Sequence, residues 1–258
     1  MPKNCLNLPK KSSKKPKTVK NRSIGTKNES SLHKTLKFRY AGPGGTTENR
    51  VGSYVADGIN ASGDIIEIQT GSFASLKEKI AEFSTHSRVK IIHPVALSKY
   101  IEVFEPSSGK KPGLRPLYRR KSPSKGSIWN LFDALVYAPH IPACPHVSIE
   151  IALVDITEIR IRDGKGSWRR KGVSIYDKKL EKWHGRIKLE KLQDYRYFVP
   201  FREDVSFTNK QLAEKVKITE ALARKTLYVL TKLGVVTRVG KQDRCWLYRI
   251  KKSPTTLK

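Results

Sequence analysis

Asp57 and Glu67 are the two side chains of this sequence whose type and spacing are best suited to chemistry. The run IIEIQT has the two-residue period of a strand, which puts Glu67 and Gln69 on one face and Ile66 and Ile68 on the other. The segment GINASGD between the carboxylates is rich in residues that tolerate positive φ, so it predicts a hairpin turn that brings Asp57 beside Glu67. Adjacent carboxylates repel each other unless a cation lies between them, and hard divalent cations such as magnesium bind through such oxygens. The pair therefore predicts a metal site able to support phosphodiester cleavage.

The spacing of Asp57 and the triplet Glu67-Ile68-Gln69 resembles the PD-(D/E)xK nuclease superfamily, over roughly residues 26–105. The resemblance implies that both carboxylates bind magnesium or manganese together with the carbonyl of Ile68. Gln69 is a departure, because it stands where the superfamily usually has a lysine. A neutral amide can orient the attacking water but is poorly suited to stabilising developing negative charge.

A lysine from the following helix could supply the positive charge that Gln69 lacks. Some members of the superfamily that the sequence resembles use such a lysine. The run FASLKEKIAEF offers Lys77 and Lys79, which flank its apolar stripe. We therefore expect Gln69 with Lys77 or Lys79 to position water and phosphate.

A helix expected over residues 29–40 precedes the hairpin. In ESSLHKTLKFRY, Glu29 shares a helical stripe with Leu32, His33 and Leu36, so its carboxylate should face inward. A buried carboxylate needs a partner, and the resemblance implies that an acidic residue on this helix joins Asp57 and Glu67 at the metal. The alternative is that Glu29 lies in the first turn, where the helix dipole favours an acid and solvent reaches it.

The elements expected around this site alternate between helix and strand. They are a helix over 29–40, strands over 51–59 and 64–70, a helix over 74–85, and strands at VKIIHPV and YIEVFEP. This order predicts an α/β (α+β) fold, in which a restriction-endonuclease-like mixed sheet over residues 29–105 is flanked by helices.

The middle of the chain is expected to extend this core. Residues 106–126 carry seven basic residues, four prolines and no acid, which predicts an extended basic linker. Residues 127–199 begin with an amphipathic helix in SIWNLFDALVYAPH. The strands VSIEIALVDITEIRIRDG and VSIYDKKLEKW follow, and their alternation predicts an antiparallel pair.

The last segment, residues 200–252, has the signals of two short helices and a hairpin. Thr208 and Thr219 are expected to cap the helices, and Gly234 ends the second one before VVTRVG and RCWLYRI flank the turn GKQD. This order resembles the winged helix-turn-helix family. The resemblance implies DNA contacts from the second helix and the wing, made by Arg224, Lys225, Tyr228, Lys232, Lys241 and Arg244. The combination resembles an uncharacterised bacterial family that couples a nuclease-like core to a winged helix.

The charge of the chain points to a polyanionic partner. Lys and Arg number 52 against 23 acidic residues, a formal net charge of +29, and nucleic acid, DNA above all, is the partner that this balance favours. Residues 1–28 hold nine basic residues and no acid, which predicts a disordered basic tail. No run approaches the ~20 apolar residues of a membrane span, so we expect a cytoplasmic protein without a membrane partner. The sequence sets no oligomeric state and is compatible with a homodimer.

Three functions remain open at this stage. The first is a magnesium-dependent endonuclease. The second is a nucleoid-associated or regulatory DNA-binding protein that keeps the fold without activity, for which Gln69 would be the first sign of decay. The third is an RNA-processing factor. A zinc site at Cys144, between His140 and His146 in HIPACPH, is a further alternative, although the prolines there favour an irregular loop without a fourth ligand.

Overall fold

The computed structural model describes residues 29–106 and 113–251, so the expected basic tail over residues 1–28 lies outside the described residues. The helices of eight residues or more are α1 (Ser31–Ala41), α2 (Lys77–His86), α4 (Asn209–Val216) and α5 (Glu220–Lys232), and α3 (Leu131–Leu135) is a short one. The strands are β1 (Thr46–Val51), β2 (Tyr54–Ile59), β3 (Ile65–Ile68), β4 (Val89–Pro106), β5 (Leu114–Lys121), β6 (Val147–Arg162), β7 (Val173–Leu189), β8 (Val236–Gln242) and β9 (Cys245–Ile250). Short 3-10 helices are η2 (Phe73–Leu76), η3 (Ile128–Asn130), η4 (Ile141–Ala143), η5 (Trp168–Arg170) and η6 (Leu192–Phe198).

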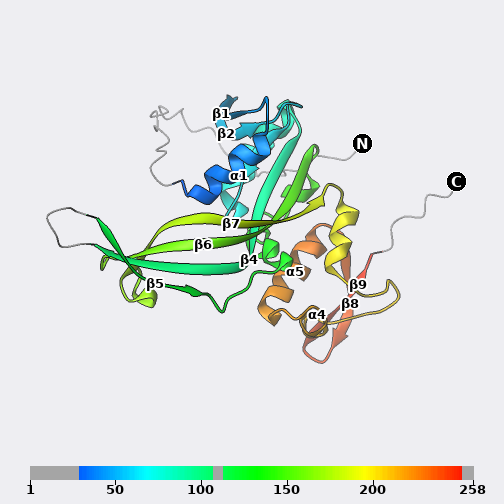
Figure 1. Ribbon diagram of the computed structural model, residues 1–258. Coiled ribbons are helices and arrows are strands. Elements are labelled where there is room, and N and C mark those ends of the chain that lie inside the picture. Colours follow the sequence, from blue (N-terminus) through cyan, green and yellow to red (C-terminus); the bar gives the residue numbers. More distant parts are fainter. Residues whose placement is uncertain (1–28, 107–112, 252–258) are drawn as a thin grey trace, which may run out of the picture.

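One mixed sheet of seven strands organises the molecule (Figure 1). Its order is β1-β2-β3-β4-β6-β7, and β5 pairs with the far end of β4. Strands β1, β2 and β3 form an antiparallel meander, whereas β4 runs parallel to both β3 and β6. The expectation of an α+β protein with a large mixed sheet and flanking helices is therefore confirmed.

Two apolar clusters cover the two faces of the sheet. On one face α1 packs Leu32 and Leu36 against Ile66 and Ile68 of β3. On the other, Ile65 belongs to a larger cluster that includes residues of α2, α3 and the C-terminal helices. The alternation of β3 thus directs its side chains as the two-residue period predicts.

Helix α1 begins two residues later than the sequence suggests. The side chain of Ser30 caps it by accepting a hydrogen bond from the backbone of His33, and the helix ends at Gly42, which has a φ of 67°. Glu29 therefore precedes the helix, and the expectation that it lies on the helical stripe is wrong. Ser30 is a stronger N-cap than Glu29 because its short hydroxyl side chain reaches the free amides of the first turn.

Three strand predictions are corrected. The expected strand over 51–59 is shorter, because it contains the turn at Gly52, with a φ of 56°, and only β2 after it; β1 lies before the turn, in a segment that was not expected to be a strand. The expected strands at VKIIHPV and YIEVFEP are one strand, β4, with a register shift between Ala96 and Ser98 where it pairs with β6. Part of the expected linker over 106–126 is β5, which pairs antiparallel with β4. Pro116 fits there because β5 is an edge strand.

The C-terminal segment contains the expected elements. Thr208 caps α4 in a reciprocal arrangement with Gln211, Thr219 caps α5, and Gly234 follows α5 with a φ of 72°. The hairpin β8–β9 comes after it. Helix α5 buries Leu227 and Leu230 in the same cluster as α3, so this segment packs against the sheet domain (Figure 1).

Candidate active site

The β2–β3 hairpin places Asp57 directly across from Glu67. Gly58 pairs with Ile66 in antiparallel register, so the preceding and following residues, Asp57 and Glu67, face each other across the two strands. The backbone N–H of Ile68 donates to Asp57 Oδ2 at 2.7 Å. Strand pairing thus fixes both carboxylates on one short stretch of sheet.

Glu67 is a buried carboxylate with an incomplete set of partners. Its side chain is 6% exposed, and Lys79 Nζ lies 2.6 Å from Oε1. The other oxygen, Oε2, is buried and has no hydrogen-bond partner among the described residues. Burial and the neighbouring charge of Asp57 raise the pKa of Glu67 to about 7, although Lys79 opposes the shift. Glu67 therefore changes protonation state near neutral pH.

Asp57 has a different environment although it lies beside Glu67. His33 Nε2 lies 3.0 Å from Asp57 Oδ2. Burial alone would raise the pKa of Asp57, but the hydrogen bond and charge of His33, the Ile68 amide and the charge of Lys79 together lower it. Two neighbouring carboxyl groups thus have pKa values that are pushed apart, an arrangement typical of sites that handle protons.

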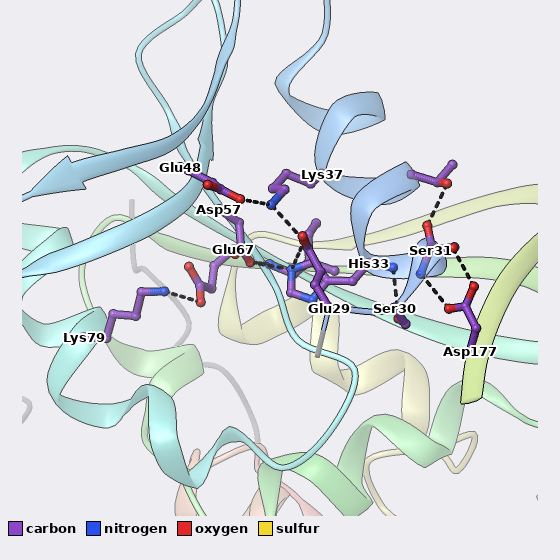
Figure 2. A network of polar contacts seen from close by, with 12 residues as sticks. Glu29, Ser30, Ser31, His33, Lys37, Glu48, Asp57, Glu67, Lys79 and Asp177 are labelled. Carbon is purple, nitrogen blue, oxygen red and sulfur yellow. Dashed lines mark hydrogen bonds and ion pairs between the residues drawn. The ribbon is translucent and has the colours of Figure 1, made fainter. Parts of the chain in front are cut away.

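His33 completes the network from the side of α1 (Figure 2). Besides Asp57, it approaches Glu29 Oε1 at 3.7 Å. Burial lowers the pKa of His33, but the hydrogen bond to Asp57 and the charges of Asp57 and Glu29 raise it above its usual value. In the sequence His33 stands out only as a member of the apolar stripe; its position four residues after Glu29 is the signal that could have identified it.

Lys37 lies buried between two carboxylates, Glu29 and Glu48 (Figure 2). Its Nζ is 2.8 Å from Glu29 Oε1 and 3.0 Å from Glu48 Oε1. Glu29 therefore reaches the network from outside the helix. Glu48, on β1, adopts a φ of 58°, an uncommon value for a residue with a side chain.

Only one of the two lysines expected to take part in the site lies close to it. Lys79 reaches Glu67, whereas Lys77 is exposed. Gln69 donates its side-chain amide to the backbone carbonyl of Ser72. The structure thus brings Glu29, Asp57, Glu67 and Lys79 into one network and places Lys77 at the surface.

The oxygen atoms of these carboxylates are of the kind that bind a hard cation such as magnesium. Carboxylate oxygens are the ligands that magnesium and manganese prefer, and the unpartnered Oε2 of Glu67 is a buried acceptor available to such an ion. In residues 29–106 and 113–251, no three His, Cys, Asp or Glu side chains are grouped as they would be around a bound metal. In the described arrangement, the ammonium group of Lys79 and the imidazole of His33 lie against the two central carboxylates.

The residues expected to contact DNA lie on α5 and the β8–β9 hairpin. Those exposed at the surface are Arg224, Tyr228, Lys232, Lys241 and Arg244. Lys225 instead pairs with Asp133 of α3 at 2.7 Å, so it ties α5 to the sheet domain. On the β8–β9 hairpin, Arg238 and Lys241 each lie 4.7 Å from the ring centroid of Trp246, which gives this surface basic and aromatic character.

Residues 30–190 match a family described as a domain of unknown function (DUF8091). The chain belongs to this family. The DUF8091 match runs from the N-cap of α1 to the residue after β7, so it contains Asp57, Glu67 and Lys79 and ends before α4.

Similarity to one relative covers more of the chain than the family match does. An uncharacterized protein of Treponema pallidum (strain Nichols) is 24% identical over 237 residues, which cover 88% of this chain and 87% of that protein. No solved structure matches the chain significantly.

Among the described residues of this DUF8091 protein, no helix is long and apolar enough to cross a membrane.

The zinc alternative concerns a different part of the surface. Cys144 and His146 line a cavity of about 510 Å³ together with Asp64. Among the described residues these side chains form no group that could hold a metal ion.

Proposed function

We propose that this protein binds DNA and hydrolyses its phosphodiester bonds as a metal-dependent endonuclease. The observation that carries the proposal is the pairing of Asp57 with Glu67 across the β2–β3 hairpin, with Lys79 from α2 beside Glu67. A lysine from this helix supplies the positive charge that Gln69 cannot.

The order of elements around the pair supports a PD-(D/E)xK type of core. Helix α1, the meander β1–β2–β3, helix α2 and the parallel strand β4 follow one another as that fold requires. The order α4, α5, β8, β9 supports a winged helix-turn-helix module in the same way. Exposed basic residues on α5 and the wing are consistent with contacts to DNA phosphates.

In this proposal Asp57, Glu67 and the Ile68 carbonyl hold magnesium or manganese, and Glu29 completes the set. The chemistry that a bound ion would supply at these residues is polarisation of a phosphoryl oxygen and a lowered pKa of a bound water. The carboxyl of Glu67 must lose its proton before it serves as a ligand, which its pKa of about 7 permits at neutral pH. Lys79, released from Glu67, offers its ammonium group to the negative charge that develops on the phosphate.

A second candidate is a protein that binds DNA without cutting it. The observation that favours it is the occupation of both central carboxylates by internal cations, since His33 pairs with Asp57 and Lys79 pairs with Glu67. Such pairs can neutralise the charge of two neighbouring carboxylates, as a metal ion would, without supporting cleavage. An RNA substrate is the remaining alternative, because charge alone does not separate RNA from DNA.

The deciding assay is incubation of the full chain with plasmid and with single-stranded DNA, in magnesium, in manganese and in chelator. We expect metal-dependent cleavage that Asp57→Asn abolishes, together with a metal-dependent rise in melting temperature that the same variant lacks. Asp64→Asn is the matched control, because Asp64 belongs to the same hairpin but pairs with Arg88 instead. The enzyme proposal is abandoned if the natural protein shows neither cleavage nor a metal-dependent rise in melting temperature.

A further inference from the structure

Strand β7 is fastened to the start of α1 beside the candidate active site. Asp177 accepts hydrogen bonds from the backbone N–H of Ser31 at 2.8 Å and from its hydroxyl at 2.6 Å. Ser31 lies between Glu29 and His33 in the sequence, and Figure 2 shows Asp177 on the side of this network away from Lys79. The residues around Asp177 therefore have a fixed position relative to the catalytic carboxylates.

Tyr176 lies at an irregularity in this part of the sheet. Ile159 pairs with Asp177, but the next residue, Arg160, pairs with Ile175, so Tyr176 has no residue opposite it on β6. Bulges of this kind occur next to active sites, where they change the direction of a side chain. Tyr176 is 66% exposed, and Ile175 beside it is also exposed.

A cavity of about 430 Å³ joins this irregularity to the candidate active site. Its walls include Glu29, His33 and Thr70 on the side of the site and Ile175, Tyr176 and Lys178 on β7. The volume lies within the ~300–1,000 Å³ typical of sites for small ligands. It is therefore large enough for part of a substrate whose reacting bond lies at Asp57 and Glu67.

The cavity is lined by the acids Glu29 and Asp177 as well as by Lys178. Glu29 is paired with Lys37, and Asp177 accepts hydrogen bonds from Ser31.

Lys178 connects the cavity to further lysines along the sheet. Lys178 also lines a neighbouring cavity of about 260 Å³, which Lys99 and Lys125 line as well. The acid there, Glu158, is engaged by Arg160 at 2.6 Å and lies 3.9 Å from Lys99. An anionic backbone that leaves the first cavity would thus meet further lysines, which is the charge complementarity that a nucleic acid strand requires.

We infer that Ile175, Tyr176 and Lys178 form a subsite for one unpaired nucleotide of a single-stranded substrate. The base stacks on the ring of Tyr176 against Ile175, and Lys178 contacts the adjoining phosphate. The inference rests on the proposed function for the reacting centre and adds the substrate class, a single strand or an unpaired end. A base inside a duplex stacks on its neighbours and has no free face for the ring, whereas an unpaired base has one.

The test measures binding without cleavage. A short labelled oligothymidylate and a duplex that contains the same strand are titrated with the full chain in chelator, and fluorescence anisotropy reports both affinities. Tyr176→Ala should weaken binding of the single strand by about 5- to 150-fold, the factor that corresponds to loss of one base–aromatic stack. Tyr176→Phe keeps the ring and should keep the affinity. Tyr118→Ala is the matched control, since Tyr118 is an exposed tyrosine on β5 outside this cavity.

The results separate this subsite from the proposed function. If the natural protein binds the duplex but not the single strand, or if Tyr176→Ala leaves the single-strand affinity unchanged, the subsite is wrong while the proposed function stands. Equal weakening of both substrates by Tyr176→Ala also overturns it, because a stack on an unpaired base is absent from the duplex. If the natural protein binds neither substrate, the proposed function falls together with the subsite.

Discussion

Replacing Glu67 by Gln should change how the stability of the protein depends on pH. The pKa of this carboxyl is raised from 4.5 to about 7 by burial and by the charge of Asp57. In the folded protein Glu67 therefore keeps its proton at pH values at which the unfolded chain has already released it. Glutamine has nearly the same shape, keeps an acceptor oxygen for Lys79 and cannot ionise.

The sign follows from the number of protons bound in each state. Between pH 4.5 and about 7 the folded state holds the Glu67 proton and the unfolded state does not, so the free energy of unfolding falls as pH rises through this window. At about 1.4 kcal/mol for each pH unit, the full loss is about 3 kcal/mol. Solvent screening reduces it little, because the side chain is 6% exposed.

The neighbouring groups alter this profile in known directions. His33 has a raised pKa, so its contribution is present below the usual histidine pKa and is lost as pH rises through its folded value, in the same direction as for Glu67. Asp57 has a lowered pKa, so its contribution is lost only as pH falls below the usual range of aspartate. Glu67→Gln should therefore remove most, and not all, of the decline between pH 5 and pH 8.

Urea unfolding of the full chain in chelator, followed by circular dichroism at a series of pH values, measures this decline. Above pH 7 the variant should be more stable than the natural protein by up to about 3 kcal/mol. Glu214→Gln, at an exposed position on α4, is the control and should keep the natural profile. Identical pH profiles for the natural protein and Glu67→Gln would refute the reasoning, because they would mean that Glu67 ionises alike in the folded and unfolded states.

Three further outcomes are expected. Deletion of residues 1–28 should flatten the plot of log affinity for DNA against log salt concentration, since each phosphate contact contributes a slope of about −0.9; an unchanged slope would mean that the tail makes no such contact. Arg224→Ala and Tyr228→Ala should each weaken binding to a preferred duplex by about 1–3 kcal/mol for every hydrogen bond to a base that the substitution removes, whereas Lys241→Ala should weaken all duplexes alike. Competition titrations with several duplexes distinguish the two patterns, and unchanged affinities would place DNA elsewhere on the surface. Gln69→Lys should leave plasmid cleavage unchanged or slower, because a second ammonium group would compete for one phosphate position; a gain of activity would show that the natural site has lost its function.

Local signals in the sequence were sufficient for the centre of the candidate site. The alternation of β3 and the turn residues of GINASGD predicted the hairpin, and the hairpin alone sets Asp57 opposite Glu67. The same holds for the caps Thr208 and Thr219, whose side chains bond to amides three residues away. Features that depend on neighbours in sequence were therefore predictable.

The rest of the network depends on contacts between distant segments. From the sequence, Lys37 is indistinguishable from the other basic residues of its helix. It is buried between Glu29 and Glu48 because α1 packs against β1. Asp177 reads as an ordinary polar position of a strand, and its role in fastening β7 to α1 follows from the sheet order. Periodicity carries no information on which distant side chains meet.

The composition of two strands, β1 and β5, is the reason that the sequence did not predict them. Strand β1 reads TTENRV, which has the polarity of a loop. Strand β5 is basic and contains Pro116, which matches an extended linker equally well. Both gain their stability from pairing with a more apolar neighbour, and that pairing cannot be read from either segment alone.

The long strand β4 has a consequence for synthesis of the protein on the ribosome. The residues of the candidate site, from Glu29 to Lys79, emerge early, but β3 must pair with β4, and β4 must pair in parallel with β6, which follows only after β5 and α3. Parallel strands joined by long connections close slowly, because the entropy of the intervening chain is lost before the contacts form. Until β6 leaves the exit tunnel, β3 and β5 can pair with one edge of β4, but the other edge of this apolar strand has no partner. The sheet order therefore leaves one long strand edge of the nascent chain open to wrong pairing during translation.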